Sequence, residues 1–259
     1  MSTQAQRNLV ALYTIVRREV MRVIRIWGQT LVPPAITMTL YFLIFGTLIG
    51  RRIGDMGGFD YMDFIVPGLV MMSIIQNSYG NISSSFFGAK FGRHIEELLV
   101  APLPPWVILT GYVGGAVLRG LAVGAVVLAI ASLFTKIRVP HPGIAVLTAL
   151  LGAMIFSLAG FVNAVYAKRF DDIAIVPTFV LTPLTYLGGV FYSVSLLPGW
   201  AQTLSHGNPI LYMVNAFRYG LLGVSDVPLV VALGVMMAFV AGLSWLGLYL
   251  LRKGVGLRT

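Results

Sequence analysis

The sequence contains no cysteine and little charge: 10% of its 259 residues are charged, whereas 58% are hydrophobic. A water-soluble domain needs roughly 25% charged residues to cover its surface, so lipid must replace water around most of this chain. The lack of cysteine excludes disulfides and thiolate metal sites. The three histidines, His94, His141 and His206, lie far apart in the sequence and have no ligand spacing. We therefore expect a membrane protein without a metal or a cofactor.

Several catalytic and energy-converting motifs are also missing. The sequence has no G-x-x-x-x-G-K-[ST] loop to cradle ATP phosphates and no H-E-x-x-H helix of a metalloprotease. Ser205 and His206 are adjacent, so they cannot face each other as a serine protease requires. Asp63 stands near the mouth of one apolar stretch, but no proton-relay acid is evident in any of them, which argues against a proton-driven carrier. The chain is expected not to be an enzyme and to carry no energy-converting site.

Six stretches are long enough to cross a hydrocarbon core, which takes about 20 residues. They predict an all-α, polytopic membrane domain formed by the whole chain, residues 1–259, with spans at Leu31–Gly50, Tyr61–Ser84, Trp106–Phe134, Gly143–Tyr166, Ile173–Tyr192 and Pro228–Leu251. The stretch Ser193–Val227, before the last span, is interrupted by glycine and proline. Its pieces are too short to span, so short re-entrant or surface helices are expected there.

Residues 1–27 read as an amphipathic helix. Apolar residues recur at spacings of three and four from Leu9 to Trp27, and Arg7, Arg18, Arg22 and Arg25 are expected on the opposite face. This pattern is typical of a helix that lies in the membrane interface. A cytosolic helix packed on a partner is the alternative.

The distribution of lysine and arginine predicts the orientation in the membrane. If the N-terminus is cytoplasmic, the cytoplasmic segments hold twelve of these residues and the opposite side holds five. Basic residues prefer the cytoplasmic side, so both termini are expected there, in the inner membrane of the cell. The same distribution accounts for the net charge of +9 without any nucleic acid.

The segment 88–101, between the second and third spans, is predicted to be a short cytoplasmic helix. Apolar and charged residues are expected on separate faces, the former including Phe91, Ile95 and Leu98, and the latter Lys90, Arg93 and Glu97. Pro102, Pro104 and Pro105 then stop the helix. Such a helix suits docking into a groove of a cytosolic protein, and a connector lying on the surface is an equal alternative.

Polar residues inside the spans are the remaining candidates. Arg119 lies deep in the third span, where a charge costs at least about 2.5–3.5 kcal/mol unless it faces protein or water. It could line a pathway, or pair with a neighbouring span. Asn77 and Asn163 need partners, for which interhelical hydrogen bonds are the preferred interpretation and a substrate path the other. Gly111-x-x-x-Gly115 and Gly120-x-x-x-Gly124 permit close helix packing.

Two segments together resemble a known family. Pro183–Pro198, which contains Gly188 and Gly189, is followed by Asn208-Pro209 and by Arg218, similar to the C-terminal signature of type-2 ABC exporter permeases. Arg93–Pro102 is similar to the acidic, leucine-rich coupling segment of that family, in which Glu96 or Glu97 matches the acidic position. Neither motif is strict, but both occur at the expected places in a six-span frame.

The resemblance implies a permease subunit of an exporter. Two copies would form the substrate pathway, and two copies of a separate ATP-binding subunit would dock beneath them through residues 90–99. Residues 189–222 would form re-entrant helices near the outer mouth. Arg119, Asn77 and Asn163 are the candidates for the pathway or the dimer seam. The substrate, whether drug, glycan or lipid, is not predicted.

Two other functions stay open on the sequence. One is a membrane enzyme that acts on a lipid-linked substrate, although no cluster of acids facing one leaflet supports it. The other is a secondary carrier coupled to an ion. An ATPase encoded nearby, or transport without an ATPase, would separate these from the exporter.

Overall fold

The computed structural model describes residues 3–136 and 139–256 of the chain. The chain there is helical apart from one small hairpin, as expected for an all-α membrane protein. Its elements are α1 (Gln4–Arg25), α2 (Trp27–Tyr41), η1 (Phe42–Ile49), α3 (Gly50–Ile53), β1 (Asp55–Met56), β2 (Phe59–Asp60), α4 (Tyr61–Phe91), α5 (His94–Val100), α6 (Pro105–Ala131), α7 (Pro142–Tyr166), α8 (Phe170–Val176), η2 (Pro177–Leu181), α9 (Thr182–Leu187), η3 (Val194–Leu196), α10 (Gly199–His206), α11 (Pro209–Leu222) and α12 (Leu229–Lys253).

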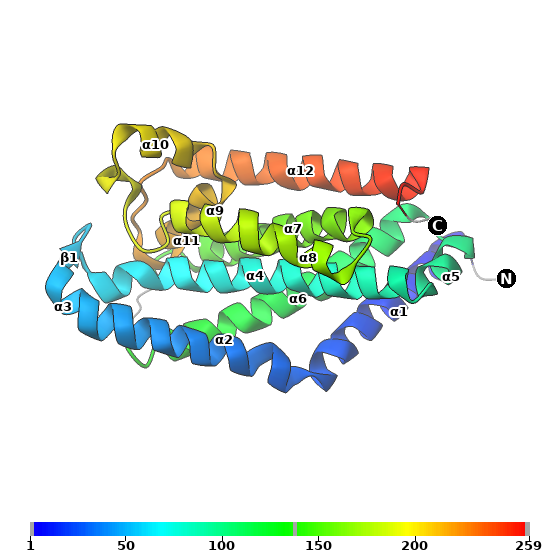
Figure 1. Ribbon diagram of the computed structural model, residues 1–259, viewed down its shortest axis with the longest axis horizontal. Helices are drawn as coiled ribbons and strands as arrows, with labels where there is room; N and C mark the ends of the chain where they lie inside the picture. The colour runs from blue at the N-terminus through cyan, green and yellow to red at the C-terminus, as the bar shows by residue number, and fades with distance from the viewer. Residues whose placement is uncertain (1–2, 137–138, 257–259) are drawn as a thin grey trace.

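The long helices lie side by side along one axis of an elongated bundle (Figure 1). Both chain termini and α5 lie at one end, which we call the terminal end. The antiparallel pair β1–β2, α3 and α10 lie at the other, which we call the hairpin end. The termini thus share one end, as the sequence predicted, while the side of the membrane that this end faces stays a prediction.

Helix α4 forms the centre of the bundle and packs against α6, α7 and α11. Small residues allow these contacts: a side chain at Gly120 or Gly124 would collide with Ser78 or Ile74 of α4. Gly111 and Gly115, one turn apart on α6, lie against α1 in the same way. The close packing predicted for both glycine pairs is therefore confirmed.

Five helical segments of the described chain are long and apolar enough to cross a membrane. They are Trp27–Gly46, Pro105–Ala131, Pro142–Tyr166, Phe170–Leu187 and Leu229–Lys253, each overlapping a predicted span. The remaining predicted span lies in α4, which is not among them. Because α4 is enclosed by neighbouring helices along much of its length, its polar residues can bond to protein. The chain is a polytopic membrane protein, and the count of six spans stays a prediction.

Two expectations from the sequence need correction. The segment 88–101 is not one helix: α4 continues to Phe91, the chain breaks at Gly92, and Arg93 takes a left-handed conformation (φ 60°) before α5 begins. The apolar face and the charged face predicted for the segment 88–101 are therefore not continuous. Nor do all the arginines of α1 point away from the protein, because Arg18 and Arg22 turn toward α4 and α6.

The interrupted stretch before α12 forms short helices, as predicted. Helix α10 has 8 residues and α11 has 14, so neither is long enough to span the bilayer. Most of α11 is buried, and it packs against α4, α7 and α12 at the hairpin end. Gly220 sits against the backbone of Ala145, which lets α11 approach α7 closely.

Candidate functional site

The predicted coupling residues divide between two helices at the terminal end. Lys90 and Phe91 belong to the last turn of α4, and Ile95, Glu96, Glu97 and Leu98 belong to α5. Ile95 is 1% exposed and anchors α5 in the core, while Glu96 and Glu97 are exposed and Leu98 is half-buried. Helix α5 packs against α4 and presents both carboxylates outward.

Lys90 is tied to its own chain. Its Nζ donates hydrogen bonds to the carbonyl oxygens of Val165 at 2.6 Å and Ala167 at 2.8 Å. These carbonyls end α7, so the ammonium caps a helix C-terminus, where a positive charge is favoured. Burial, and then the positive charge of Lys168, lower the pKa of the Lys90 amine. Lys90 therefore fixes α4 to α7 beside α5.

An exposed aromatic group lies next to this contact. Phe91 is 63% exposed, and its ring lies 5.9 Å from that of Phe87 and 5.0 Å from that of Phe170, measured between centroids. Phe91 and Phe170 are both at the terminal end, one at the end of α4 and one at the start of α8. Together with α5 they form a surface of apolar and acidic side chains.

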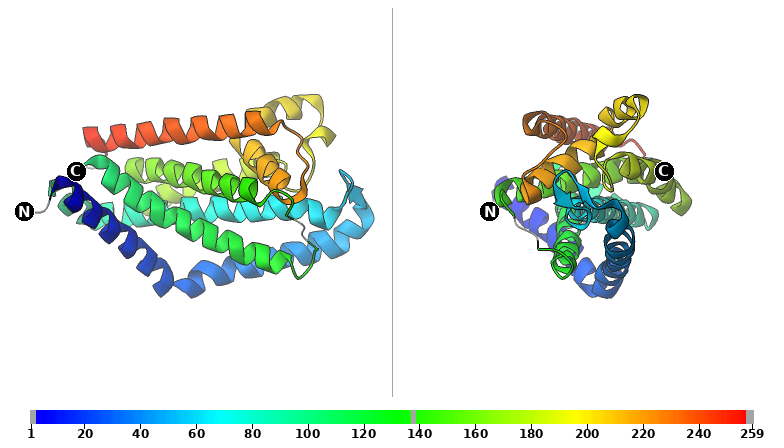
Figure 2. Two further views of the ribbon diagram at one scale, coloured as in Figure 1. Left: turned by 180° about the vertical axis from the view of Figure 1, so that it is seen from behind. Right: turned by 90° about the vertical axis from the view of Figure 1, so that its left-hand side faces the viewer.

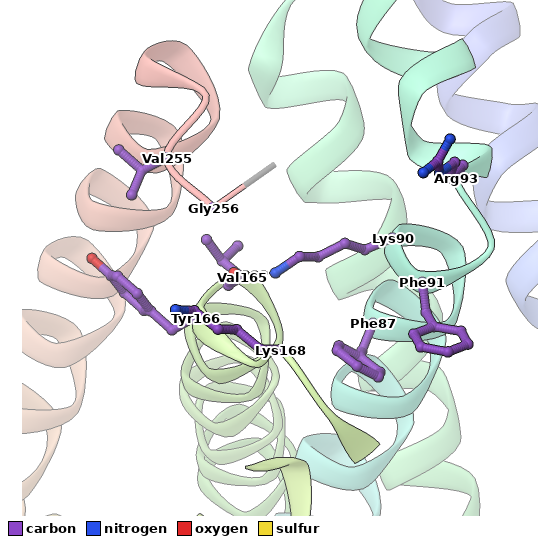
Figure 3. Close-up of a pocket in the computed structure, with 9 residues that line it drawn as sticks. All are labelled: Phe87, Lys90, Phe91, Arg93, Val165, Tyr166, Lys168, Val255 and Gly256. Atoms are coloured by element: carbon purple, nitrogen blue, oxygen red, sulfur yellow. Dashed lines mark hydrogen bonds between the residues drawn. The ribbon is translucent and has the colours of Figure 1, made fainter. Parts of the chain in front are cut away.

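A cleft of about 630 Å³ opens beside this surface. Figure 3 shows that its lining comes from the end of α4, the end of α7 and the segment after α12. Three of the lining residues are basic, Lys90, Arg93 and Lys168, and none is acidic. The others are aromatic, aliphatic or glycine: Phe87, Phe91, Val165, Tyr166, Val255 and Gly256.

A buried polar network joins α1 to α4 and α6, and we call it the Glu19 seam. Glu19 is 2% exposed, and its carboxylate accepts hydrogen bonds from Arg22 Nη2 at 3.0 Å, Ser85 Oγ at 2.6 Å and Arg18 Nη2 at 3.4 Å. Arg18 also donates to the Tyr112 hydroxyl of α6 at 2.6 Å. Figure 2 shows α1 alongside the first half of α6, where Gly115 makes room for Glu19.

Arg119 belongs to this same network. Its Nη1 donates to Asn81 Oδ1 at 3.3 Å, and the same oxygen accepts a hydrogen bond from Arg22 Nη2 at 2.8 Å. The seam therefore gathers three arginines around one glutamate and one asparagine. Asn81 thus gives Arg119 a partner on a neighbouring helix, as in the structural alternative stated above. The role of Arg119 in a pathway stays a prediction.

The two predicted asparagines lie elsewhere. Asn163 of α7 donates to the carbonyl of Ile173 in α8 at 3.4 Å, an interhelical bond as expected. Asn77 donates within its own helix, to the carbonyl of Ser73. It lies beside a row of exposed residues on α4, Gln76, Gly80 and Ser84, which we call the polar stripe. Figure 1 shows this middle part of α4 between α2 and α8.

The signature residues meet at the hairpin end. Arg218 is 1% exposed, donates to the carbonyl of Gly189 at 2.6 Å and lies over the Phe64 ring. Asn208 caps α11 and donates to the Leu184 carbonyl at 2.6 Å.

The remaining signature residues shape this region. A side chain at Gly188 would collide with Ile210, while Pro209 begins α11 and Pro198 stands just before α10. Of the signature residues, Gly189 contacts Arg218 directly, and the others shape the ends of the neighbouring helices.

Sequence reasoning missed two acids that organise these regions. Glu19 is the only acidic residue in the first 54 and lies between Arg18 and Arg22, which was a readable signal of a buried ion pair. Asp226 lies 3.8 Å from Arg218 Nη1 and accepts hydrogen bonds from Ser193 Oγ and Val194 N. Nothing in its local sequence marks Asp226, because its partners lie 8 to 33 residues earlier.

The sequence matches known proteins over nearly its whole length. A family model described as "ABC-2 type transporter" matches residues 10–222. The chain is 61% identical over 250 residues to the inner membrane transport permease YadH of Escherichia coli K12, covering 96% of this chain and 98% of that protein. It is 29% identical over 186 residues to nodulation protein J of Sinorhizobium fredii, covering 71% and 70%. Nodulation protein J of Neorhizobium galegae is 25% identical over 220 residues, covering 83% and 82%.

Proposed function

The chain belongs to the ABC-2 type transporter family, and from this premise we propose that two copies of it form a homodimeric exporter driven by two copies of an ATP-binding subunit. Membership makes the chain a multi-pass permease subunit of an ABC transporter in the inner membrane, associated with an ATP-binding subunit. Transport rather than catalysis is its role. The stoichiometry, the direction of transport and the residues below are our proposal.

The single observation that carries the proposal is the surface at the terminal end. Glu96 and Glu97 project from α5, Phe91 is exposed beside them, and Ile95 holds α5 to the core. A short helix with exposed carboxylates and an apolar neighbour fits a groove with basic and apolar walls. We assign this groove to the ATP-binding subunit, because the chain has no phosphate-binding loop of its own.

Charge reversal tests the docking surface. The change Glu96→Lys with Glu97→Lys should abolish co-purification of the ATP-binding subunit while leaving membrane insertion intact, because both side chains are exposed. The matched control is Asp55→Lys with Asp60→Lys, which makes the same change in charge at the hairpin end. Co-purification and transport that survive in the Glu96/Glu97 variant would contradict the docking role.

The polar stripe supports a second copy and a pathway. Gln76, Gly80 and Ser84 lie about four residues apart in the middle of α4, so they share one face of the helix. All three are exposed in the single chain, and polar groups that face lipid tails are costly. Contact with a second copy, or with water between two copies, removes this cost. On this arrangement α2 and α9 approach the partner copy, and α4 lines the path.

The absence of cysteine makes this arrangement directly testable. A single cysteine at Ile36 of α2 or Phe179 of η2, both exposed, should cross-link to its copy in native membranes. A cysteine at Gln76 or Ser84 should react with a water-soluble thiol reagent. The control is Trp245→Cys on the exposed face of α12, which should do neither. Cross-linking through position 245 and not through 36 or 179 would contradict the proposed dimer.

The shared position of the termini and the distribution of basic residues support an orientation with the terminal end in the cytoplasm. The terminal end carries α5, and α1 starts there and bears five arginines along its length. Basic residues prefer the cytoplasmic side. Placing this end in the cytoplasm also gives the ATP-binding subunit access to α5. ATP-dependent efflux from cells, absent when the ATP-binding subunit is removed, is the expected result. Transport by the purified permease alone would instead support the carrier.

A further inference from the structure

The cleft at the terminal end lies where α4 and α7 end, close to the end of α12. It is bounded by residues at the ends of α4 and α7 and by Val255 and Gly256, which lie two and three positions after the end of α12. Phe87 and Phe91 of α4 supply aromatic surface on one side, and Tyr166 of α7 supplies it on the opposite side (Figure 3). The volume of about 630 Å³ falls in the range of sites for small ligands.

The charges of the cleft are unbalanced. Lys90, Arg93 and Lys168 line it without any acidic residue among the lining. Lys90 Nζ binds two carbonyl oxygens, which carry no net charge, and the Lys168 side chain makes no ion pair in the described structure. The nearby Asp172 is committed to the backbone N–H groups of Lys168 and Arg169. An anion in the cleft would relieve the repulsion between the two lysines.

From this combination we propose that the cleft binds the headgroup of an anionic phospholipid. A phosphodiester supplies the negative charge that the three basic residues lack, and basic pockets between membrane helices suit such headgroups. The apolar lining then contacts the glycerol backbone and the start of the acyl chains. A free phosphate would use the basic residues but leave the aromatic side chains on both sides of the cleft without a partner.

The position of the cleft gives the lipid a structural role. One wall consists of Lys90 and Phe91, in the last turn of α4, and of Arg93, which lies between α4 and α5. A bound headgroup therefore bridges α4, α7 and the segment after α12 just beside the proposed docking surface. With the proposed orientation, the bound lipid belongs to the cytoplasmic leaflet. The binding itself does not depend on that orientation.

Native mass spectrometry of the purified permease, without the ATP-binding subunit, tests the proposal. Dioleoyl phosphatidylglycerol should bind at one saturable site per chain, and dioleoyl phosphatidylcholine should not saturate it. Lys168→Ala should weaken the phosphatidylglycerol affinity about fivefold and Lys168→Glu roughly thirtyfold, because each basic residue near an anionic lipid contributes about 1 kcal/mol. Lys168→Arg should retain binding. Lys136→Ala and Lys136→Glu, at the hairpin end, are the matched controls and should bind like the parent.

Two outcomes would overturn the assignment. If phosphatidylglycerol binds equally to the parent and the Lys168→Glu variant, the cleft is not the site. If glycerol 3-phosphate, which lacks acyl chains, binds as tightly as the lipid, the cleft is a site for a soluble phosphate. Because the assay needs neither the ATP-binding subunit nor transport, its result is independent of the proposed exporter function.

Discussion

Removal of the Glu19 carboxylate should destabilise the permease more than removal of any exposed acid. Glu19→Ala leaves Arg18, Arg22 and Arg119 close together in the seam without an acid, and Ser85 loses its acceptor. The methyl group of alanine keeps the contact with Gly115, so the loss is electrostatic rather than a change of backbone packing.

The magnitude follows from burial. Breaking a buried ion pair by removing one partner costs about 3–5 kcal/mol. Glu19 is fully buried, but the Arg18 and Arg22 side chains are 47% and 32% exposed, so water offsets part of the loss. We expect about 2–3 kcal/mol, which for a chain of this size lowers the melting temperature by roughly 5–10 °C.

Thermal unfolding of the purified permease in one detergent, followed by intrinsic fluorescence, measures this loss. The matched control is Glu96→Ala, an exposed acid whose removal should change stability by less than about 0.5 kcal/mol. The double variant Glu19→Ala with Arg22→Ala should recover part of the loss, since it also removes one of the half-buried charges left without an acid. A Glu19→Ala variant that melts with the parent would refute the reasoning.

Three further predictions concern single contacts. Gly220→Ala should lower the melting temperature or the yield of folded protein, since its methyl would lie 2.7 Å from the backbone nitrogen of Ala145, whereas Gly234→Ala, in open space, should not. Asn208→Ala should lower the free energy of unfolding by at least about 1 kcal/mol, measured by thermal unfolding, because it removes the N-cap of α11. It also removes the hydrogen bond to the Leu184 carbonyl of α9. Backbone hydrogen bonds, foremost that from Lys168, lower the pKa of the Asp172 carboxylate. Its contribution to the stability of the fold is therefore present above the ordinary aspartate pKa and is lost as the pH falls through the lowered pKa. The difference in melting temperature between the parent and Asp172→Asn should therefore be present at pH 7 and vanish in strong acid.

The helices could be predicted because lipid imposes a length and a composition on each of them. Their boundaries were less predictable. The first span was expected to begin at Leu31, but α2 begins at Trp27, directly after the bend at Ile26 that separates it from α1. The fifth was expected to reach Tyr192, but α9 ends at Leu187 before Gly188 and Gly189. Hydropathy does not register either boundary, because it reports composition and not the direction of the backbone.

The site residues were predictable only where their partners are near in sequence. The capping role of Asn208 follows from Asn-Pro at the start of a helix. The position of Glu19 depends on Gly115, which lies 96 residues further along, and on Asn81 and Ser85 of another helix. No local pattern contains that information. The break at Arg93 also escaped prediction, because a left-handed conformation is uncommon for a residue other than glycine.

The structure changes how a movement of α5 should reach the pathway. One route for such a movement is the proline-containing connection 102–105, which joins α5 to α6. In the structure, α5 is anchored to the core by Ile95 and packs on α4, with only Gly92 and Arg93 between the two helices. A push on α5 therefore acts first on α4, the helix that carries the polar stripe.

Helix α4 also holds α1 through the Glu19 seam, so α1 should move with it. Asn81 and Ser85 of α4, which bind Arg22 and Glu19, lie next to residues of the polar stripe in the sequence. Any shift of α4 must carry these contacts along or break them. Glu19→Gln keeps the shape of the side chain but removes its charge, which weakens the link without emptying the seam. We expect this variant to reduce the rate of ATP-driven transport clearly, while its melting temperature stays close to that of the parent. The reason is that the seam would join helices that move during transport.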